Sequence, residues 1–224
     1  MIRGEVICSV DDFGKNQKTN RNILKLLEMG KVDRVSIMVK REVGENEIER
    51  LIASKAKLDI HLEIPQIQKK DRKEIFGRSF SFLRNYLSKE GGLLEIRKEW
   101  TKQIEKFQQL FGRLPDGLSS HEYVHFFPPY FKIICTLREK FNIPYLRFGE
   151  KRILKVNTNP TSLILSFLHF FNKKHLKKGF SSDYMVSSDW IYDDLIFFKN
   201  LPKGTIEVVY HPEREEEMER IINS

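Results

Sequence analysis

The sequence predicts an α/β fold, a (β/α) barrel formed by one domain over residues 1–224. Short apolar segments alternate with longer segments of helical periodicity, a pattern typical of a parallel sheet covered by helices. Polar residues stand at the carboxyl ends of several apolar segments, and in a barrel these ends converge on one mouth. No glycine-rich phosphate loop follows the first apolar segment, which disfavours an open nucleotide-binding sheet.

The first part of the chain contains three predicted strands and two predicted helices. In chain order these are a strand over 6–10, a helix over 19–29, a strand over 35–39, a helix over 45–55 and a strand over 58–62. Ile23, Leu24 and Leu27 have helical spacing, and Gly30 is a natural helix terminator. Val6-Ile7-Cys8 and Val35-Ser36-Ile37 are instead short and β-branched, as expected for buried strands.

The second part continues the alternation. It predicts a helix over 95–111, a strand over 117–120, a helix from Pro128 to Phe141, strands over 143–148 and 205–210, and an acidic terminal helix that starts at Pro212. Ile96, Trp100 and Phe107 lie on one helical stripe, which indicates an amphipathic helix. Pro128 suits the first turn of a helix because its missing N–H has no intrahelical partner there.

Composition narrows the class of protein. The net charge is +8, but 39 basic residues are interspersed with 31 acidic ones, which favours a solvated mixed surface over a nucleic-acid-binding one. A nucleic-acid-binding module rests on charge alone and ranks last. Cys8 and Cys135 lie in apolar segments and are expected to be free, buried thiols. Neither a signal peptide nor a bilayer-spanning segment is recognisable, so a cytoplasmic location is expected.

A group of acidic residues and histidines follows the predicted strands. Asp11 and Asp12 end the first strand, and His61, His121 and His211 stand at or just beyond the ends of three others. Adjacent carboxylates repel each other, and a divalent metal ion would relieve that repulsion. Two imidazoles and one carboxylate would form an open metal site. Taken singly, the aspartates can be a helix cap or an Asx turn, and an isolated histidine is more often structural.

The segment His121-Glu122-Tyr123-Val124-His125 carries two histidines four positions apart. On a helix, such a pair can bind zinc. The prolines at 128 and 129 argue against a continuous helix, so that only one of the two is expected to face a metal ion. His211 lies between a tyrosine and a proline, which suits a positioned proton donor, although a capping histidine is the ordinary alternative.

Several segments resemble the YdjC-like carbohydrate deacetylases, a family that includes chitooligosaccharide deacetylases and is distantly similar to NodB-type polysaccharide deacetylases. The matching segments are Ser9–Gly14, Gly30–Val39, His61–Leu62, Ser120–His125, Glu207–Pro212 and the pair Arg147 and Glu150. The resemblance implies a distorted TIM-like barrel with about seven strands. It also implies a hydrolase that removes the acetyl group from an N-acetylated sugar or oligosaccharide.

The resemblance also implies roles for individual residues. Asp12, His61 and His121 would bind a divalent metal ion, Mg²⁺ by preference and Zn²⁺ as the alternative. Asp11 would be the general base, His211 the acid or oxyanion partner, and Arg147 a support for the charged groups. The residues expected to contact substrate are Phe13, His125 and Glu150.

Some positions depart from the family pattern. Ser119 replaces an aspartate, Lys40 an asparagine and Glu213 a glycine, and Glu63-Ile64-Pro65 follows His61 where threonine is usual. Loss of the aspartate could weaken metal affinity or change metal preference. An alternative hypothesis is therefore a degenerate member that binds sugar or regulates without turnover.

The segment from Phe167 to Phe180 combines four phenylalanines with four lysines. Such a helix can lie on an acidic membrane surface, which would suit a lipid-linked amino sugar. The simpler interpretation is a barrel helix with a lysine-rich outer face. A homodimer is also compatible with the sequence.

Overall fold

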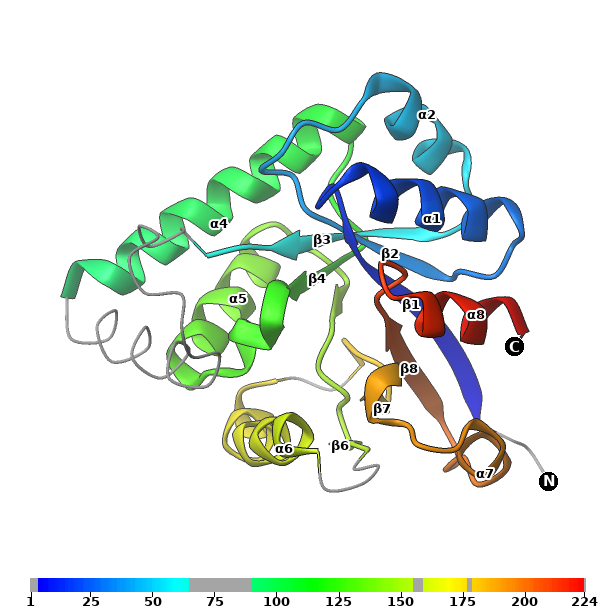
Figure 1. Ribbon diagram of the computed structural model, residues 1–224. Helices are drawn as coiled ribbons and strands as arrows, with labels where there is room; N and C mark the ends of the chain where they lie inside the picture. Colours follow the sequence, from blue (N-terminus) through cyan, green and yellow to red (C-terminus); the bar gives the residue numbers. More distant parts are fainter. Residues whose placement is uncertain (1–3, 65–89, 155–158, 177–178, 224) are drawn as a thin grey trace, which may run out of the picture.

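The computed structural model describes residues 4–64, 90–154, 159–176 and 179–223. Eight parallel strands form one curled sheet with helices around it (Figure 1). Their order is β5-β4-β3-β2-β1-β8-β7-β6. The outer strands β5 and β6 do not pair with each other in the described ranges, so the barrel stays open between them. The predicted α/β fold, a distorted TIM-like barrel, is confirmed.

Strands and helices alternate through most of the chain. The strands are β1 (Glu5–Phe13), β2 (Arg34–Ile37), β3 (Lys57–Leu62), β4 (Gly117–Ser120), β5 (Tyr145–Leu146), β6 (Arg152–Ile153), β7 (Tyr184–Ser187) and β8 (Thr205–Tyr210). The α-helices are α1 (Gln17–Glu28), α2 (Glu45–Ala53), α4 (Glu90–Phe111), α5 (Pro128–Lys140), α6 (Pro160–Asn172), α7 (Asp194–Lys199) and α8 (Glu215–Asn223). The 3₁₀ helices are η1 (His121–Phe126), η2 (Lys173–His175) and η3 (Ser188–Trp190).

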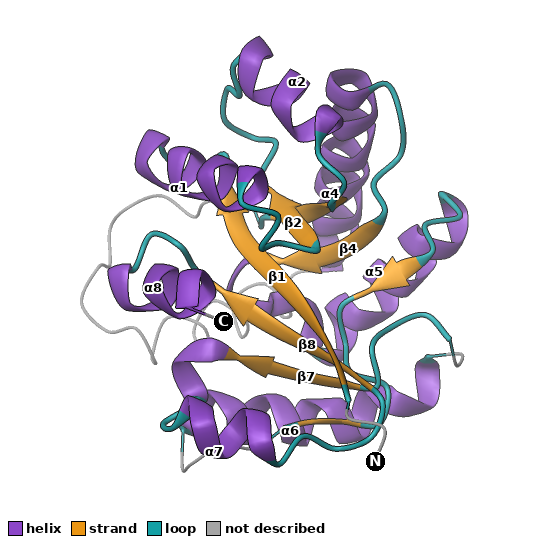
Figure 2. Ribbon diagram, turned by 90° about the vertical axis from the view of Figure 1, so that its right-hand side faces the viewer, coloured by secondary structure: helices purple, strands orange, loops and turns teal. Residues whose placement is uncertain are grey.

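The helices pack on the outer face of the sheet (Figure 2). Ile96, Trp100, Ile104 and Phe107 form the buried stripe of α4, each with no exposed surface. Burial of one such side chain contributes about 1.5–3 kcal/mol to the free energy of unfolding. At the start of α1, Asn16 Oδ1 accepts a hydrogen bond of 3.0 Å from the Thr19 amide and thereby caps the helix.

The barrel interior contains charged residues. Arg34 donates two hydrogen bonds to Asp59, of 2.8 and 2.6 Å, and its guanidinium lies 3.8 Å from the centre of the Tyr145 ring. A Cβ atom at Gly117 would lie 2.6 Å from Asp59 Oδ1 and 2.7 Å from Arg34 Nη2, so only glycine fits beside this pair. This ion pair occupies part of a barrel interior that, in other barrels, is usually filled by branched apolar side chains.

The predicted strands agree with the structure better than the helix predicted near residue 170. The predicted strands over 117–120 and 205–210 coincide with β4 and β8, whereas that over 143–148 is limited to the two residues of β5. The helix expected over 167–180 is instead α6, which ends at Asn172. Within the described ranges, no helix is long and apolar enough to cross a bilayer. Cys8 and Cys135 are free and half-buried.

Candidate active site

The end of β1 brings two consecutive carboxylates to one place. Neighbouring side chains of a regular strand point to opposite faces of the sheet. The β1–β2 register shifts between Val10 and Phe13, and Asp12 has a left-handed backbone with φ of 72°. As a result, His61 Nε2 lies 3.8 Å from Asp11 Oδ2 and 3.5 Å from Asp12 Oδ1. A bulge of this kind re-aims side chains next to active sites.

Asp12, His61 and His121 form a compact group of donor atoms. One such atom from each residue lies within 4.8 Å of the other two. His121 Nδ1 donates to Asp12 Oδ1 over 3.1 Å, and the two imidazole rings are 5.6 Å apart. Asp12 and His61 are buried, whereas the His121 side chain is 38% exposed and faces the opening. The site therefore offers one carboxylate and two imidazoles, with one side open.

Ser119 fixes the orientation of His61. The Ser119 hydroxyl oxygen lies 2.8 Å from His61 Nδ1, and the hydroxyl can itself donate to the Ile60 carbonyl or to Ser36 Oγ. His61 Nδ1 then donates to Ser119, which leaves Nε2 unprotonated toward the carboxylates. Burial lowers the pKa of His61 to about 4 in spite of the nearby aspartates. The imidazole is therefore neutral near pH 7, as a metal ligand must be.

Arg147 holds Asp11 from behind the site. This arginine is 1% exposed and donates 2.7 Å hydrogen bonds to Asp11 Oδ2 and Glu207 Oε1, and one of 2.9 Å to Ser36 Oγ. The buried Asp11 Oδ1 accepts no hydrogen bond from any residue that the structure describes. Burial raises the pKa of Asp11, but Arg147 and His61 outweigh it, and the pKa falls to about 2. Asp11 is thus ionised and has one free oxygen.

His211 is paired with a carboxylate that was not predicted. Glu217 on α8 is 3% exposed, and its Oε2 accepts the His211 amide at 2.8 Å and lies 3.5 Å from His211 Nδ1. The Ser188 hydroxyl and Arg214 also bond to this carboxylate. Burial lowers the pKa of His211, but the nearby carboxylates, with Glu217 the strongest, have the larger, opposite effect. The pKa of His211 therefore lies above its usual value. Glu217 thus favours the protonated form of His211.

Replacing Glu217 by Gln is expected to lower the pKa of His211, because burial then acts without the carboxylate. The pKa of Glu217 is about 2 against an ordinary 4.5, so its contribution to folding is present above pH 4.5 and is lost as the pH falls toward 2. The variant should show a weaker pH dependence of the unfolding free energy in that interval. NMR titration and urea unfolding measure both effects.

Glu216→Gln is the matched control, because this neighbouring carboxylate is exposed. A His211 pKa that is the same in wild type and Glu217→Gln would contradict the pairing.

The side chains of the three residues expected to contact substrate are engaged with other parts of the protein. His125 is fully buried, with Nε2 donating to the Arg147 carbonyl at 2.9 Å and Nδ1 2.6 Å from Ser120 Oγ. Glu150 Oε1 accepts the amides of Gly179 and Phe180. Phe13 also has no exposed surface. A role of these residues toward a sugar stays a prediction.

Two residues at the mouth were not among the predicted site residues. Lys15 Nζ lies 3.1 Å from Asp12 Oδ2 and 2.6 Å from Glu213 Oε2, and thus links the loops after β1 and β8. Glu63, just after β3, has a carboxyl pKa raised by burial, with Lys40 and His121 acting against the rise. The departures at positions 213 and 63 therefore place two acidic residues around the donor group of Asp12, His61 and His121. Glu213 is paired with a lysine that approaches Asp12.

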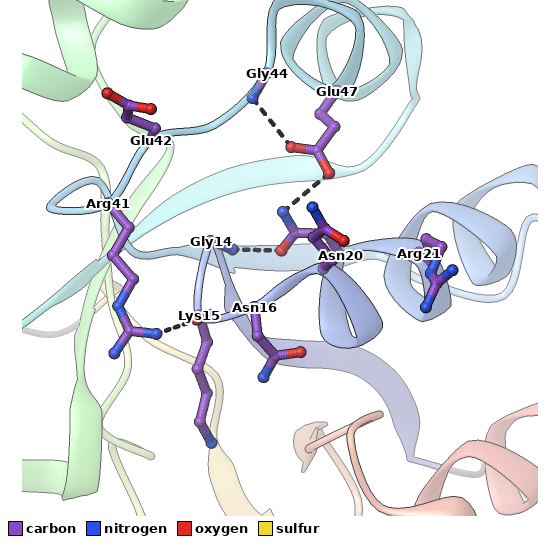
Figure 3. A pocket seen from close by; sticks show the side chains of 10 residues that line it. Gly14, Lys15, Asn16, Asn20, Arg21, Arg41, Glu42, Gly44 and Glu47 are labelled. Carbon is purple, nitrogen blue, oxygen red and sulfur yellow. Dashed lines mark hydrogen bonds between the residues drawn. The ribbon is translucent and has the colours of Figure 1, made fainter.

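A polar pocket lies beside the mouth, with a volume of about 440 Å³. It is lined by Gly14, Lys15, Asn16, Gln17, Asn20, Arg21, Arg41, Glu42, Gly44 and Glu47. Figure 3 shows Asn20 at its centre, where it accepts the Gly14 amide at 2.7 Å and donates to Glu47 at 3.0 Å. The Lys15 side chain extends away from Arg41 in this view. Lys15 is therefore shared by the pocket and the site around Asp12.

Comparison with known proteins assigns the chain to a family. The family model described as YdjC-like protein matches residues 5–223. The chain belongs to the YdjC-like family. Similar proteins include a carbohydrate deacetylase of Clostridium beijerinckii, 29% identical over 72% of this chain and 68% of the relative. A chitooligosaccharide deacetylase of Escherichia fergusonii is 25% identical over 92% of this chain and 81% of the relative.

A solved structure from Enterococcus faecalis V583 supports the fold of this YdjC-like chain. A role in cellobiose-phosphate cleavage has been suggested for that protein. The two share 20% identity with a TM-score of 0.61, over 94% of this chain and 81% of the other. At this identity the likeness concerns the fold alone.

Proposed function

We propose that this YdjC-like protein is a metal-dependent hydrolase that removes an acetyl group from an N-acetylated sugar or oligosaccharide. The observation that carries the proposal is the free, ionised Asp11 oxygen beside the donor group of Asp12, His61 and His121. The names of its curated relatives, carbohydrate deacetylase and chitooligosaccharide deacetylase, favour this substrate class.

The residues present fit a divalent metal ion. Asp12, His61 and His121 would bind it, and the neutral imidazole of His61 turns an unprotonated nitrogen toward the site. Two imidazoles beside one carboxylate suit Zn²⁺ better than Mg²⁺, which prefers oxygen ligands. The expected Mg²⁺ and the alternative Zn²⁺ should therefore be compared directly. When bound, such an ion would lower the pKa of a bound water toward neutral pH, and it would also polarise the amide carbonyl of the substrate.

The chain's own residues supply the proton transfers. Asp11 Oδ1 accepts the proton of the attacking water, and the hydrogen bond from Arg147 to Oδ2 keeps the carboxylate in position. His211, whose protonated form Glu217 favours, donates a proton to the leaving amine. Amide hydrolysis needs one group that accepts a proton and one that donates it, and the surroundings of these two residues lower the pKa of Asp11 and raise that of His211.

Acetate release from acetylated chitooligosaccharides tests the proposal. The protein is stripped of metal, reconstituted with Zn²⁺ or Mg²⁺, and assayed together with its bound-metal content. Activity is expected only with metal, and His61→Ala should lose both metal and activity. A stripped protein that hydrolyses the substrate as fast as the reconstituted one would reject the proposal.

One contact favours a second candidate function, a sugar-binding protein without turnover. The Lys15 ammonium lies 3.1 Å from the Asp12 carboxylate, and a cation in that position opposes metal binding. This alternative predicts that chitooligosaccharides raise the melting temperature while no acetate is released. Release of acetate at many turnovers per protein molecule would dismiss it.

Replacing Ser119 by Asp is expected to tighten metal binding by about 10–100-fold, because a carboxylate on His61 Nδ1 makes the ligand nitrogen more basic. Competition with a chromophoric chelator measures the affinity, and thermal unfolding shows whether the variant folds. Ser119→Asn is the matched control, since it adds similar volume without charge. Equal affinities for the Asp and Asn variants would contradict the role given to Ser119.

A further inference from the structure

The helix α6 has an inverted distribution of polar and apolar residues. Its buried residues are Ser162, Leu165, His169 and Asn172, three of which are polar. Its large exposed side chains are Leu163, Ile164, Phe167, Phe170 and Phe171, with Phe170 76% and Phe167 64% exposed. A helix on the surface of a soluble protein normally buries its apolar stripe. We name these five exposed residues the α6 face.

Hydrogen bonds fix the orientation of the helix. His169 Nε2 donates to the Gly149 carbonyl over 2.6 Å, and Asn172 Nδ2 donates to the Phe126 carbonyl over 2.5 Å. Turning the helix to bury its phenylalanines would break both bonds and leave buried polar groups unpaired. The α6 face is therefore directed outward. Contiguous apolar patches of this kind mark interaction sites.

Positive charge adjoins the α6 face. No charged residue occurs within α6 itself, and the exposed Lys173, Lys174 and His175 follow directly as η2. In the sequence, Lys177 and Lys178 follow after Leu176, and no acidic residue occurs between positions 160 and 178. The lysines thus lie beyond the helix and not on its outer face. The expectation of a barrel helix with a lysine-rich outer face is therefore wrong. An aromatic face beside lysines complements an anionic interface.

A second exposed apolar group lies on the same edge of the molecule. Tyr192 and Leu195 are exposed by 86% and 85%, and Ile196 also projects from α7. Both ribbon views place α6 and α7 along one edge, the lower one (Figures 1 and 2). The neighbouring acidic groups are engaged: Asp193 caps the Ile196 amide at 2.9 Å, and Asp194 pairs with Arg220.

We propose that the α6 face, together with the apolar residues of α7, is a docking surface for an anionic lipid membrane. A helix of 13 residues is about 20 Å long and can lie in the interface with its aromatic rings below the headgroups. A second copy of this chain would bring the same lysines and the same net charge of +8, so charge favours the lipid surface over self-association.

The docking surface is joined to the candidate active site. Asn172 binds the carbonyl of Phe126, the last residue of η1, and His121 begins the same six-residue segment, whose backbone is kinked at Glu122 and Tyr123. Docking through α6 would therefore hold this segment close to the membrane. An N-acetylated sugar presented on a lipid is the substrate class that this arrangement favours, a step that rests on the proposed deacetylase function.

Co-sedimentation of the full chain with vesicles tests the docking surface. The protein is expected to bind phosphatidylcholine vesicles that contain phosphatidylglycerol. The affinity of the double variant Phe167→Ser, Phe170→Ser for these vesicles should be lower than that of wild type by about tenfold or more. Lys173→Gln with Lys174→Gln should weaken binding about tenfold on anionic vesicles only. Ile52→Ser, which changes an exposed apolar residue on α2, should bind like wild type.

Three outcomes would overturn the proposal: no binding of wild type to anionic vesicles, equal binding by the phenylalanine variant, or equal loss in the Ile52 variant. A dimer that the phenylalanine variant converts to monomer, without vesicle binding by wild type, would identify a second copy as the occupant. Acetate release from soluble chitooligosaccharides should be unchanged in the variants. Vesicle binding without any acetate release would reject the proposed function and leave the docking surface standing.

Discussion

Replacing Asp11 by Asn is expected to slow turnover strongly while metal stays bound, whereas replacing Asp12 by Asn is expected to remove the metal. For Asp11→Asn, kcat should fall by about 10²–10⁴-fold, the usual contribution of a general base. For Asp12→Asn, metal affinity should fall by more than about 100-fold, because a direct ligand contributes more than a residue that only orients one. Two adjacent carboxylates would thus have separable roles.

The contacts of the two residues explain this difference. Asp11 gives one oxygen to Arg147 and keeps the other free, while Asp12 Oδ1 lies nearest to His121 and His61. Asparagine preserves the shape of each side chain and tolerates the left-handed backbone found at position 12. Neither variant is therefore expected to unfold, and the effects can be assigned to the lost charge.

Two measurements separate the effects. The bound metal is determined after dialysis, and acetate release is measured at saturating metal concentration. Asp183→Asn is a suitable control, since this residue precedes β7 at the end of the barrel opposite to the site and pairs with Lys151. If Asp11→Asn lost the metal as completely as Asp12→Asn, the assignment of Asp11 as base would be wrong.

The gathering of Asp12, His61 and His121 could be predicted from the sequence. Each residue stands at or near the carboxyl end of a predicted strand or directly after it, and parallel strands place those ends on the same edge of the sheet. β1 and β8 were recognisable because they contain several β-branched apolar residues, and β3 because leucine and isoleucine alternate with polar residues along it. Local patterns thus carry both the fold and the position of the mouth.

The residues that support the site could not be predicted in this way. Glu207 lies inside the apolar strand β8, and its partner Arg147 is 60 positions away, so no local periodicity connects them. Glu217 resembles its exposed neighbours on an acidic helix, and only the fold shows that it turns inward to His211. The inverted polarity of α6 likewise depends on which side the barrel covers. These features arise from tertiary packing, which overrides local sequence preference.

Replacing Arg147 by Met is expected to lower the free energy of unfolding by about 3–5 kcal/mol at pH 7. The arginine is fully buried between Asp11 and Glu207, and its removal leaves two carboxylates without their cation. In wild type, the Asp11 pKa of about 2 lies below its ordinary 3.8, so Asp11 stabilises the fold above pH 3.8 and this contribution fades as the pH falls toward 2. Urea unfolding at several pH values measures the loss.

In Arg147→Met the sign of the pH dependence should reverse. Without the guanidinium, only the nearby histidines oppose the effect of burial, and the pKa of Asp11 rises. Protonation then relieves the buried charge, so the variant is least destabilised in acid. Arg147→Lys keeps the positive charge but not the three-way hydrogen bonding, and it should fall between wild type and Met. A Met variant destabilised by the same amount at pH 5 and pH 8 would show that its cost comes from lost packing and not from uncompensated carboxylates.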